Sequence, residues 1–157
     1  MTTHRAEFHL ASPEDTAQLA VRLGAELRAG DCVLLSGGIG AGKSHFARAL
    51  ILSRLAEPED VPSPTFTLVQ TYDLLDGELW HADLYRLSDV NHIIELGLLD
   101  AMQSAITLIE WPDRLADLTP RNALHIEIGD AARDDTRTLN MNATDERWAR
   151  VIEALQT

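Results

Sequence analysis

Apolar positions along the chain follow two periods, and each period predicts a different kind of element. Uninterrupted apolar runs, or strict alternation of apolar and polar residues, are typical of strands. Such patterns predict strands at residues 7–10, 32–35, 65–72, 79–85, 106–109, 124–128 and 137–141. Asp76 and Gly77 indicate a hairpin turn between two of them. The last two predicted strands alternate as an antiparallel pair does.

Apolar residues spaced three or four apart predict four helices. Leu19, Leu23 and Leu27 form the inner stripe of the first, which we expect to begin after Ser12 as N-cap and to end before Gly30. The others are expected at residues 43–55, at residues 90–102 with a break at Gly97, and at a C-terminal helix that Thr144 or Asp145 caps. Residues 57–65 are interrupted by prolines and predict a loop.

Helices alternate with strands over most of the chain, and hairpins interrupt the alternation. The run at residues 32–35 is apolar without interruption, as a strand buried on both faces is. This order predicts an α/β fold whose central sheet is mostly parallel, with antiparallel edge strands. A chain of 157 residues is the length of one domain, so residues 1–157 are expected to form a single domain.

The composition, 45% hydrophobic and 24% charged, is that of an ordinary soluble globular protein. The one cysteine, Cys32, cannot form an internal disulfide and stands in an apolar run, which indicates a buried thiol in a reducing compartment. The start of the chain has no signal-peptide core, and no apolar run is long enough to span a membrane. We therefore expect a cytoplasmic protein without a membrane partner.

The formal net charge of −12 repels nucleic acid and anionic lipid at long range. It argues against DNA binding and against autonomous binding of RNA. It also leaves little positive charge for an anionic ligand, so a bound phosphate would need backbone dipoles and a metal ion.

One glycine-rich stretch carries a strong motif. Residues 37–44 read GGIGAGKS and match G-x-x-x-x-G-K-[ST], between a predicted buried strand and a predicted helix, as this phosphate-binding loop requires. Lys43, the only lysine in the chain, is expected to reach the β- and γ-phosphates of ATP, and the Ser44 hydroxyl to ligate Mg²⁺. The nucleotide-binding residues predicted from this stretch are Gly37, Gly38, Ile39, Gly40, Ala41, Gly42, Lys43, Ser44 and His45.

Two carboxylates follow apolar runs and are candidates for the magnesium site and for catalysis. Asp83 ends LWHAD and Glu110 ends ITLIE. Both would then lie at carboxyl ends of strands, beside the phosphate loop. One is expected to hold Mg²⁺ while the other polarises the attacking water. The alternative is that one of them is only a polar residue at a strand end.

Three further residues near these motifs are candidates for the site. Trp111 follows Glu110 and is a candidate for stacking on the base, or a core tryptophan. Thr65 lies in the loop SPTFT and is a candidate sensor of the γ-phosphate, or part of a solvated turn. Arg86 stands three residues after Asp83, where it would face a phosphate, a partner or a surface acid.

These segments together resemble a known family. GGIGAGKS, SPTFTLV, HADLYRL and IEW match the bacterial TsaE (YjeE) family in order and spacing over residues 8 to 130. The resemblance implies a P-loop NTPase fold with helices on both faces of the sheet. It also implies an ATPase, slow on its own, that supports the N6-threonylcarbamoyladenosine (t6A) modification of tRNA at position 37. The implied partner is a TsaB–TsaD-type complex, in which TsaD transfers the group, so that tRNA is contacted only indirectly.

The resemblance also implies roles for individual residues. It assigns Lys43 to phosphate and Ser44 to Mg²⁺, makes Glu110 the second magnesium ligand and Asp83 an essential catalytic acid, and places Trp111 near the nucleotide. The chain departs from the family pattern at Gly38, Ile39, Ser44 and Ala82, where the family usually has an acidic residue, leucine, threonine and often phenylalanine. It assigns no role to Arg133 or Arg137, because the C-terminal third matches less.

Other functions are open on the residues alone. A P-loop small-molecule kinase of the shikimate-kinase type would need arginines for its lid and substrate, and Arg114, Arg121, Arg133 and Arg137 leave that possibility. A GTPase would need an Asn-Lys-x-Asp motif, which a chain with one lysine lacks. A regulatory subunit that binds nucleotide without hydrolysing it remains the third reading.

Overall fold

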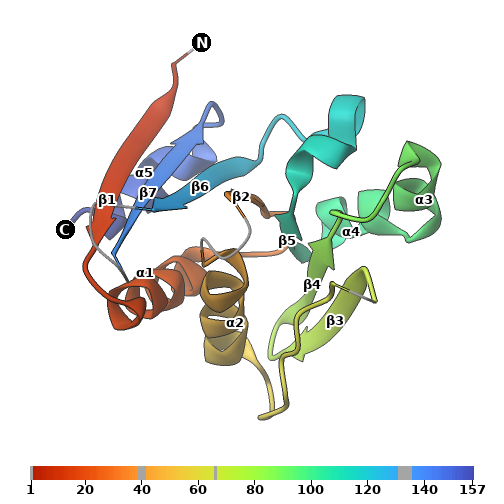
Figure 1. Ribbon diagram of the computed structural model, residues 1–157, viewed down its shortest axis with the longest axis horizontal. Helices are drawn as coiled ribbons and strands as arrows, with labels where there is room; N and C mark the ends of the chain where they lie inside the picture. The colour runs from red at the N-terminus through yellow and green to blue at the C-terminus, as the bar shows by residue number, and fades with distance from the viewer. Residues whose placement is uncertain (1, 39–41, 66, 131–135) are drawn as a thin grey trace.

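The computed structural model describes residues 2–38, 42–65, 67–130 and 136–157. They form a seven-stranded sheet in the order β1-β7-β6-β2-β5-β4-β3 (Figure 1). The strands are β1 (His4–Leu10), β2 (Cys32–Ser36), β3 (Val69–Leu74), β4 (Gly77–Asp83), β5 (Ile106–Glu110), β6 (Leu124–Asp130) and β7 (Arg137–Ala143).

The centre of the sheet is parallel and both edges are antiparallel. β6, β2, β5 and β4 run in the same direction, whereas β3 pairs antiparallel with β4, and β7 pairs antiparallel with β6 and β1. The predicted α/β fold with a mostly parallel sheet and antiparallel edges is therefore confirmed. The apolar runs of β2 and β5 fit their central place, because a strand covered on both faces has no polar side to present to water.

Helices cover both faces of the sheet. They are α1 (Pro13–Glu26), α2 (Lys43–Arg54), α3 (Val90–Glu95), α4 (Leu98–Ser104), the 3-10 helix η1 (Pro112–Leu118) and α5 (Arg147–Leu155). α1, α2 and α5 share one buried apolar cluster with the sheet, and α3, α4 and η1 share a second cluster on its other face. Successive side chains of a strand point to opposite faces of the sheet and so belong to different clusters. On β2, Val33 and Leu35 belong to the first cluster, and Cys32 and Leu34 belong to the second.

Local signals in the sequence set several helix ends. The Ser12 hydroxyl accepts a hydrogen bond of 3.2 Å from the backbone N–H of Asp15 and caps α1. Gly97, at φ 81°, separates α3 from α4 as predicted, because glycine enters this left-handed region without steric cost. Before α5, the Asp145 carboxylate accepts the N–H of Arg147 at 2.8 Å, so it is the effective capping side chain of the two candidates.

Several predicted boundaries are wrong, and β1, for example, begins at His4 and not at Glu7. β3 begins at Val69 and not at Thr65, because the N–H of Leu68 donates to the carbonyl of Pro64 at 2.8 Å and closes a turn there. β4 ends at Asp83 and not at Tyr85, whose N–H turns back to the Asp83 carboxylate at 3.0 Å. α1 ends at Glu26, before the last leucine of its predicted stripe.

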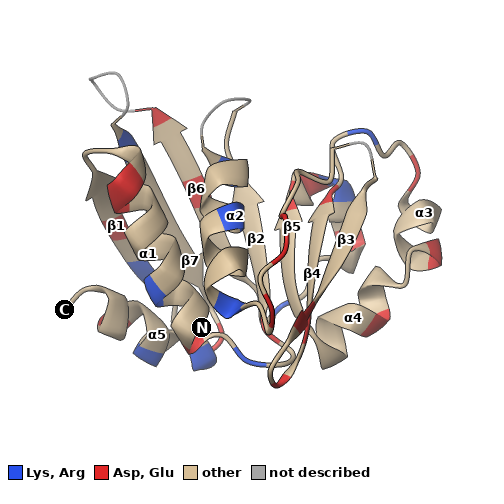
Figure 2. Cartoon of the chain, turned by 90° about the horizontal axis from the view of Figure 1, so that it is seen from below, with Lys and Arg blue, Asp and Glu red and all other residues tan. Residues whose placement is uncertain are grey.

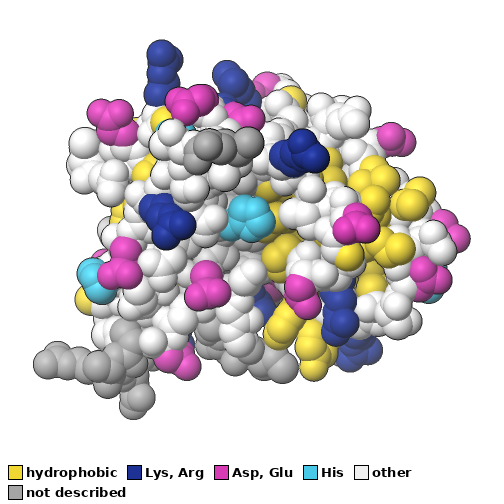
Figure 3. Space-filling view, turned by 90° about the horizontal axis from the view of Figure 1, so that it is seen from above, with side chains coloured by type: hydrophobic (Ala, Val, Ile, Leu, Met, Phe, Trp, Pro, Cys, Tyr) yellow, Lys and Arg dark blue, Asp and Glu magenta, His cyan; other side chains and the backbone are white. Residues whose placement is uncertain are grey.

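The surface mixes charges of both signs. On the face in Figure 3, arginine side chains are interspersed with acidic ones, and apolar side chains gather toward α3, where Val90 and Ile94 are exposed.

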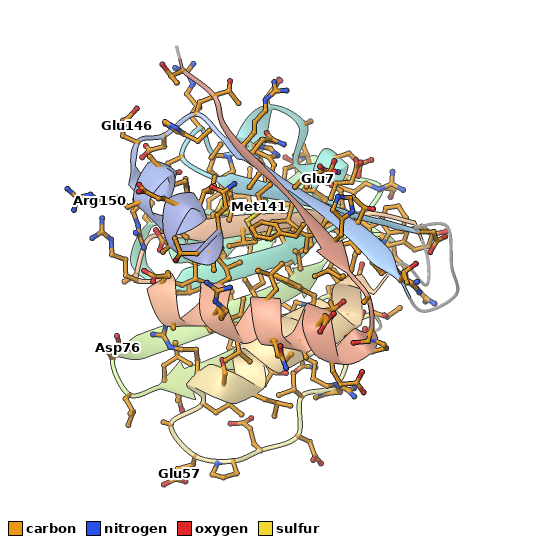
Figure 4. The ribbon with its side chains drawn as sticks, turned by 90° about the vertical axis from the view of Figure 1, so that its left-hand side faces the viewer. Glu7, Glu57, Asp76, Met141, Glu146 and Arg150 are labelled. Carbon is orange, nitrogen blue, oxygen red and sulfur yellow. The ribbon has the colours of Figure 1, made fainter. Side chains whose placement is uncertain are left out.

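At the opposite end of the molecule, Glu146 and Arg150 point outward around α5, whereas Met141 of β7 lies inside (Figure 4). Within the described ranges, no helix has both the length and the apolar composition to cross a membrane.

Candidate active site

The carboxyl ends of three parallel strands meet at one edge of the sheet. Asp83 of β4 is directly opposite Glu110 of β5, and Glu110 is opposite Leu35 of β2. The glycine-rich loop leaves β2 at this edge and enters α2, so the acidic strand ends lie beside the N-terminus of that helix (Figure 2). This confirms the predicted placement of both carboxylates at strand ends.

The described part of the glycine-rich loop holds the lysine in place. Gly42 precedes α2 with φ 108°, a conformation that favours glycine. The Nζ of Lys43 donates to the carbonyl oxygen of Gly37 at 2.6 Å, and the side chain is only 5% exposed. Burial lowers the pKa of Lys43 from its ordinary value, while the negative charges of Glu110, Asp83 and Asp113 act in the opposite direction.

Glu110 lies at the meeting point of α2 and the strands. Its Oε1 accepts a hydrogen bond of 3.4 Å from the hydroxyl of Ser44, at the first turn of α2. Its Oε2 is 2.7 Å from Nε2 of His81, which comes from β4. Glu110 and His81 are each only 2% exposed. The carboxylate is therefore held from two sides by groups on two different elements.

Asp83 is held by the loop that precedes β3. Its Oδ2 accepts a hydrogen bond of 3.4 Å from the hydroxyl of Thr65, which is itself 2.8 Å from the hydroxyl of Ser63. Its Oδ1 accepts the backbone N–H of Tyr85. Thr65 thus links the loop before β3 to the candidate catalytic acid.

Trp111 closes one side of the site. Its backbone is left-handed, with φ 57° and ψ 54°, which is strained for a bulky residue and turns the chain from β5 into η1. Its ring lies against the ring of Tyr85, with centroids 4.7 Å apart. The Nζ of Lys43 is 3.6 Å from the Trp111 ring centroid, within the range of a cation–π contact.

These residues line one cleft of about 360 Å³. Its lining consists of Gly42, Lys43, Ser44, His45, Thr65, Asp83, Tyr85, Glu110 and Trp111. The structure thus brings together eight of the residues predicted for the site. Gly37 contributes its carbonyl to Lys43, Gly38 does not line the cleft, and Ile39, Gly40 and Ala41 lie outside the described residues. The Nε2–H of His45 donates to the carbonyl of Pro13 at 2.9 Å, so its ring joins the cleft wall to the start of α1.

Two residues of this site had no predicted role. Tyr85 packs on Trp111, and His81 contacts Glu110. A signal for both was present in HADLYRL, where His81, Asp83 and Tyr85 are spaced two apart and so share one side of an extended chain.

The donors in the cleft suit Mg²⁺. This ion is typically held by one or two carboxylates and a hydroxyl, with phosphates and waters completing an octahedron, and does not need a cage of protein ligands. The 3.4 Å contact between Ser44 Oγ and Glu110 Oε1 places a hydroxyl and a carboxylate oxygen side by side. Within the described residues, no cluster of three or more His, Cys, Asp or Glu is placed to hold a metal ion.

Comparison with known proteins identifies a family that this chain matches. Residues 10–139 match the family model described as threonylcarbamoyl adenosine biosynthesis protein TsaE. The tRNA threonylcarbamoyladenosine biosynthesis protein TsaE of Rickettsia bellii is 37% identical over 132 residues, covering 84% of this chain and 91% of the relative. The Bacillus subtilis protein of the same name is 32% identical over 152 residues, covering 95% of this chain and 92% of the relative.

A solved structure supports the fold. The crystal structure of Bacillus subtilis YdiB superposes with a TM-score of 0.80 and 25% identity, covering 99% of this chain and 97% of that one. The seven-stranded mixed sheet therefore has the expected P-loop-type fold.

Proposed function

Because this chain belongs to the TsaE family of tRNA threonylcarbamoyladenosine biosynthesis proteins, we propose that it is the Mg²⁺-dependent ATPase that supports the t6A modification. The observation that carries the proposal is one cleft in which Lys43, Ser44, Asp83 and Glu110 converge from α2, β4 and β5. A P-loop ATPase requires these groups: a phosphate-binding lysine, a hydroxyl for the metal, and carboxylates at strand ends.

The phosphates of ATP are bound by the loop at residues 37–44. Backbone N–H groups and the positive end of the α2 dipole face the phosphate oxygens, and Lys43 neutralises the β- and γ-phosphates. In the structure Lys43 rests on the Gly37 carbonyl and the Trp111 ring, two contacts that a phosphate replaces when ATP binds. Bound phosphate also restores negative charge around Lys43, which favours its protonated form.

The metal is held by Ser44 and Glu110, with Asp83 beside them. Mg²⁺ stabilises the charge that develops on the transferred phosphoryl group. Asp83 orients the attacking water, with Thr65 keeping its carboxylate in place. Because Thr65 belongs to the loop before β3, that loop is the element that senses the γ-phosphate in this proposal.

The base lies beside Trp111. The Tyr85 ring backs the Trp111 ring at 4.7 Å and gives it a fixed orientation along the cleft. An aromatic ring in this position stacks on the face of adenine and makes no hydrogen bonds to the edge of the base.

Hydrolysis serves a TsaB–TsaD-type complex, and the protein contacts tRNA only indirectly. The net charge of −12 supports this, because an acidic surface does not attract RNA by itself. We further propose that residues 1–157 form one domain, which the single sheet running through the described chain supports.

A small-molecule kinase fits the cleft less well. Among the described residues that line it, Lys43 is the only lysine or arginine, whereas kinases of this size use additional arginines. Incubation with ATP and a panel of phosphate acceptors separates the two functions. ADP and inorganic phosphate alone support an ATPase, and any phosphorylated acceptor contradicts it.

The cellular role is tested by capture of candidate TsaB and TsaD proteins on this chain, with ATP and with ADP. Nucleotide-dependent capture supports the role. A complete lack of capture with either nucleotide contradicts it, even where hydrolysis is measured.

A further inference from the structure

We propose that His81 positions Glu110 for the metal by occupying one of its two carboxylate oxygens. This inference rests on the proposed Mg²⁺-dependent ATPase. Nε2 of His81 and Oε2 of Glu110 are 2.7 Å apart, and both side chains are 2% exposed. A carboxylate can only accept, so Nε2 carries the proton and donates it to this hydrogen bond.

The sheet register makes this contact possible. Asp83 is opposite Glu110, so His81 lies two residues earlier on β4, opposite Leu108. Residues two apart on a strand point to the same face, which puts His81, Asp83 and Glu110 on the side of the sheet that α2 covers. His81 reaches from β4 to the neighbouring strand, toward the carboxylate that Ser44 contacts from α2.

The division of the two oxygens has a consequence for the metal. Because His81 is hydrogen-bonded to Oε2 of Glu110, the Glu110 oxygen available to a metal ion is Oε1. This oxygen already lies 3.4 Å from the Ser44 hydroxyl. Rotation of the carboxylate away from Ser44 would break the short hydrogen bond to His81. His81 therefore keeps Oε1 of Glu110 beside Ser44, the other predicted magnesium ligand, before any nucleotide binds.

The rest of the His81 environment offers no competing role. Nδ1 of His81 is buried without a hydrogen-bond partner among the described residues. An imidazole retained for packing alone would be replaced at little cost by an apolar residue, because an unpaired buried polar atom is unfavourable. The one side-chain hydrogen bond that His81 makes with the described part of the chain goes to Glu110, the proposed metal ligand, as the outer partners of metal ligands do.

Four variants test the proposal. His81→Leu keeps a similar volume and removes the donor, His81→Gln places an amide N–H near the position of Nε2, and His81→Asn is too short to reach Glu110. His92→Leu, on the exposed face of α3, is the matched control. For each, calorimetry gives the affinity for ADP with Mg²⁺ and with EDTA, and steady-state assays give kcat and KM for MgATP.

In the wild type, Mg²⁺ should raise the affinity for ADP relative to EDTA. We expect this increase to be about 10-fold to 100-fold smaller in His81→Leu and His81→Asn, and kcat to fall by a similar factor. Affinity in EDTA should not change, which also reports that the variants are folded. His81→Gln should restore most of both quantities, and His92→Leu should match the wild type. Should His81→Leu fail to fold, the Gln and Asn pair carries the same comparison.

Several results overturn the proposal. In one, Mg²⁺ raises the ADP affinity of His81→Leu or His81→Asn as much as that of the wild type. In another, His81→Gln loses as much of this Mg²⁺-dependent affinity as His81→Asn does. An equal loss of ADP affinity in EDTA would mean that His81 only maintains the cleft. If the wild type hydrolyses ATP while these variants behave like it, the positioning role fails and the ATPase stands. A wild type that hydrolyses no ATP, either alone or with the candidate TsaB–TsaD complex, overturns both.

Discussion

Asp83 and Glu110 lie directly opposite each other on the parallel strands β4 and β5, yet each is held by a different part of the protein. Glu110 is bound by Ser44 of α2 and by His81, whereas Asp83 is bound by Thr65 and the backbone of Tyr85. One carboxylate is thus tied to the phosphate-binding helix and the other to the loop before β3. This division suits a fixed metal ligand beside a group that responds to the bound nucleotide.

Lys43→Ala is expected to weaken MgATP binding by at least about tenfold, because a charge-assisted hydrogen bond to phosphate contributes roughly 1.5–3 kcal/mol. Calorimetric titration measures the change. Arg150→Ala, on the exposed side of α5, removes the same charge far from the cleft and should bind as the wild type does. Near-normal affinity in Lys43→Ala would remove the basis of the phosphate site.

The single lysine permits a second readout of the same site. A lysine-reactive ATP analogue can label only Lys43 and the N-terminal amine. We expect labelling at Lys43 that excess MgATP suppresses, detected by peptide mass analysis. Labelling that MgATP leaves unchanged would place the nucleotide elsewhere.

Trp111 is expected to report nucleotide binding. ADP should change the tryptophan emission of the wild type and leave that of Trp111→Phe unchanged. Of the two tryptophans left in that variant, Trp80 packs on the second cluster, on the face of the sheet away from α2, and Trp148 is buried in the core and donates its Nε1–H to the carbonyl of Asn122 at 2.7 Å. Replacing Trp111 alone keeps that core contact intact. An equal emission change in both proteins would show that Trp111 does not contact the bound nucleotide.

Much of this arrangement follows from local sequence patterns. The buried strand at residues 32–35, the Ser12 cap and the break at Gly97 depend on near neighbours along the chain, and all are present. The carboxylates could be placed because strands of a parallel sheet end at one edge. These features need no knowledge of distant contacts.

Other features depend on register and turn geometry, which the pattern does not specify. The strand predicted from Thr65 begins only at Val69, because the hydrogen bond from the N–H of Leu68 to the carbonyl of Pro64 closes a turn there. The contact between His81 and Glu110 requires knowing that Asp83 pairs with Glu110, because a shift by one residue would turn His81 to the other face. The left-handed backbone of Trp111 runs against the preference of a bulky residue, so local propensity does not predict it.

Cys32 is expected to be inert in the folded protein. It is fully buried, and burial raises the pKa of its thiol from 9.0 to about 12. The thiolate is the reactive form, and at pH 8 it is then roughly one part in ten thousand. A thiol-specific chromogenic reagent should react slowly with native protein and stoichiometrically in guanidinium chloride. Rapid reaction of the native protein would contradict the burial of β2.

The most direct measurement of the central claim is the formation of ADP and inorganic phosphate from labelled ATP under single-turnover conditions with saturating Mg²⁺, alone and with the candidate TsaB–TsaD complex. We predict that the wild type forms both products in equal amounts. Glu110→Gln should still bind ATP and be slower by about 100-fold or more, since it loses the charged ligand that stabilises the transition state. No product from the wild type in either condition, or an unchanged rate in Glu110→Gln, would contradict the account.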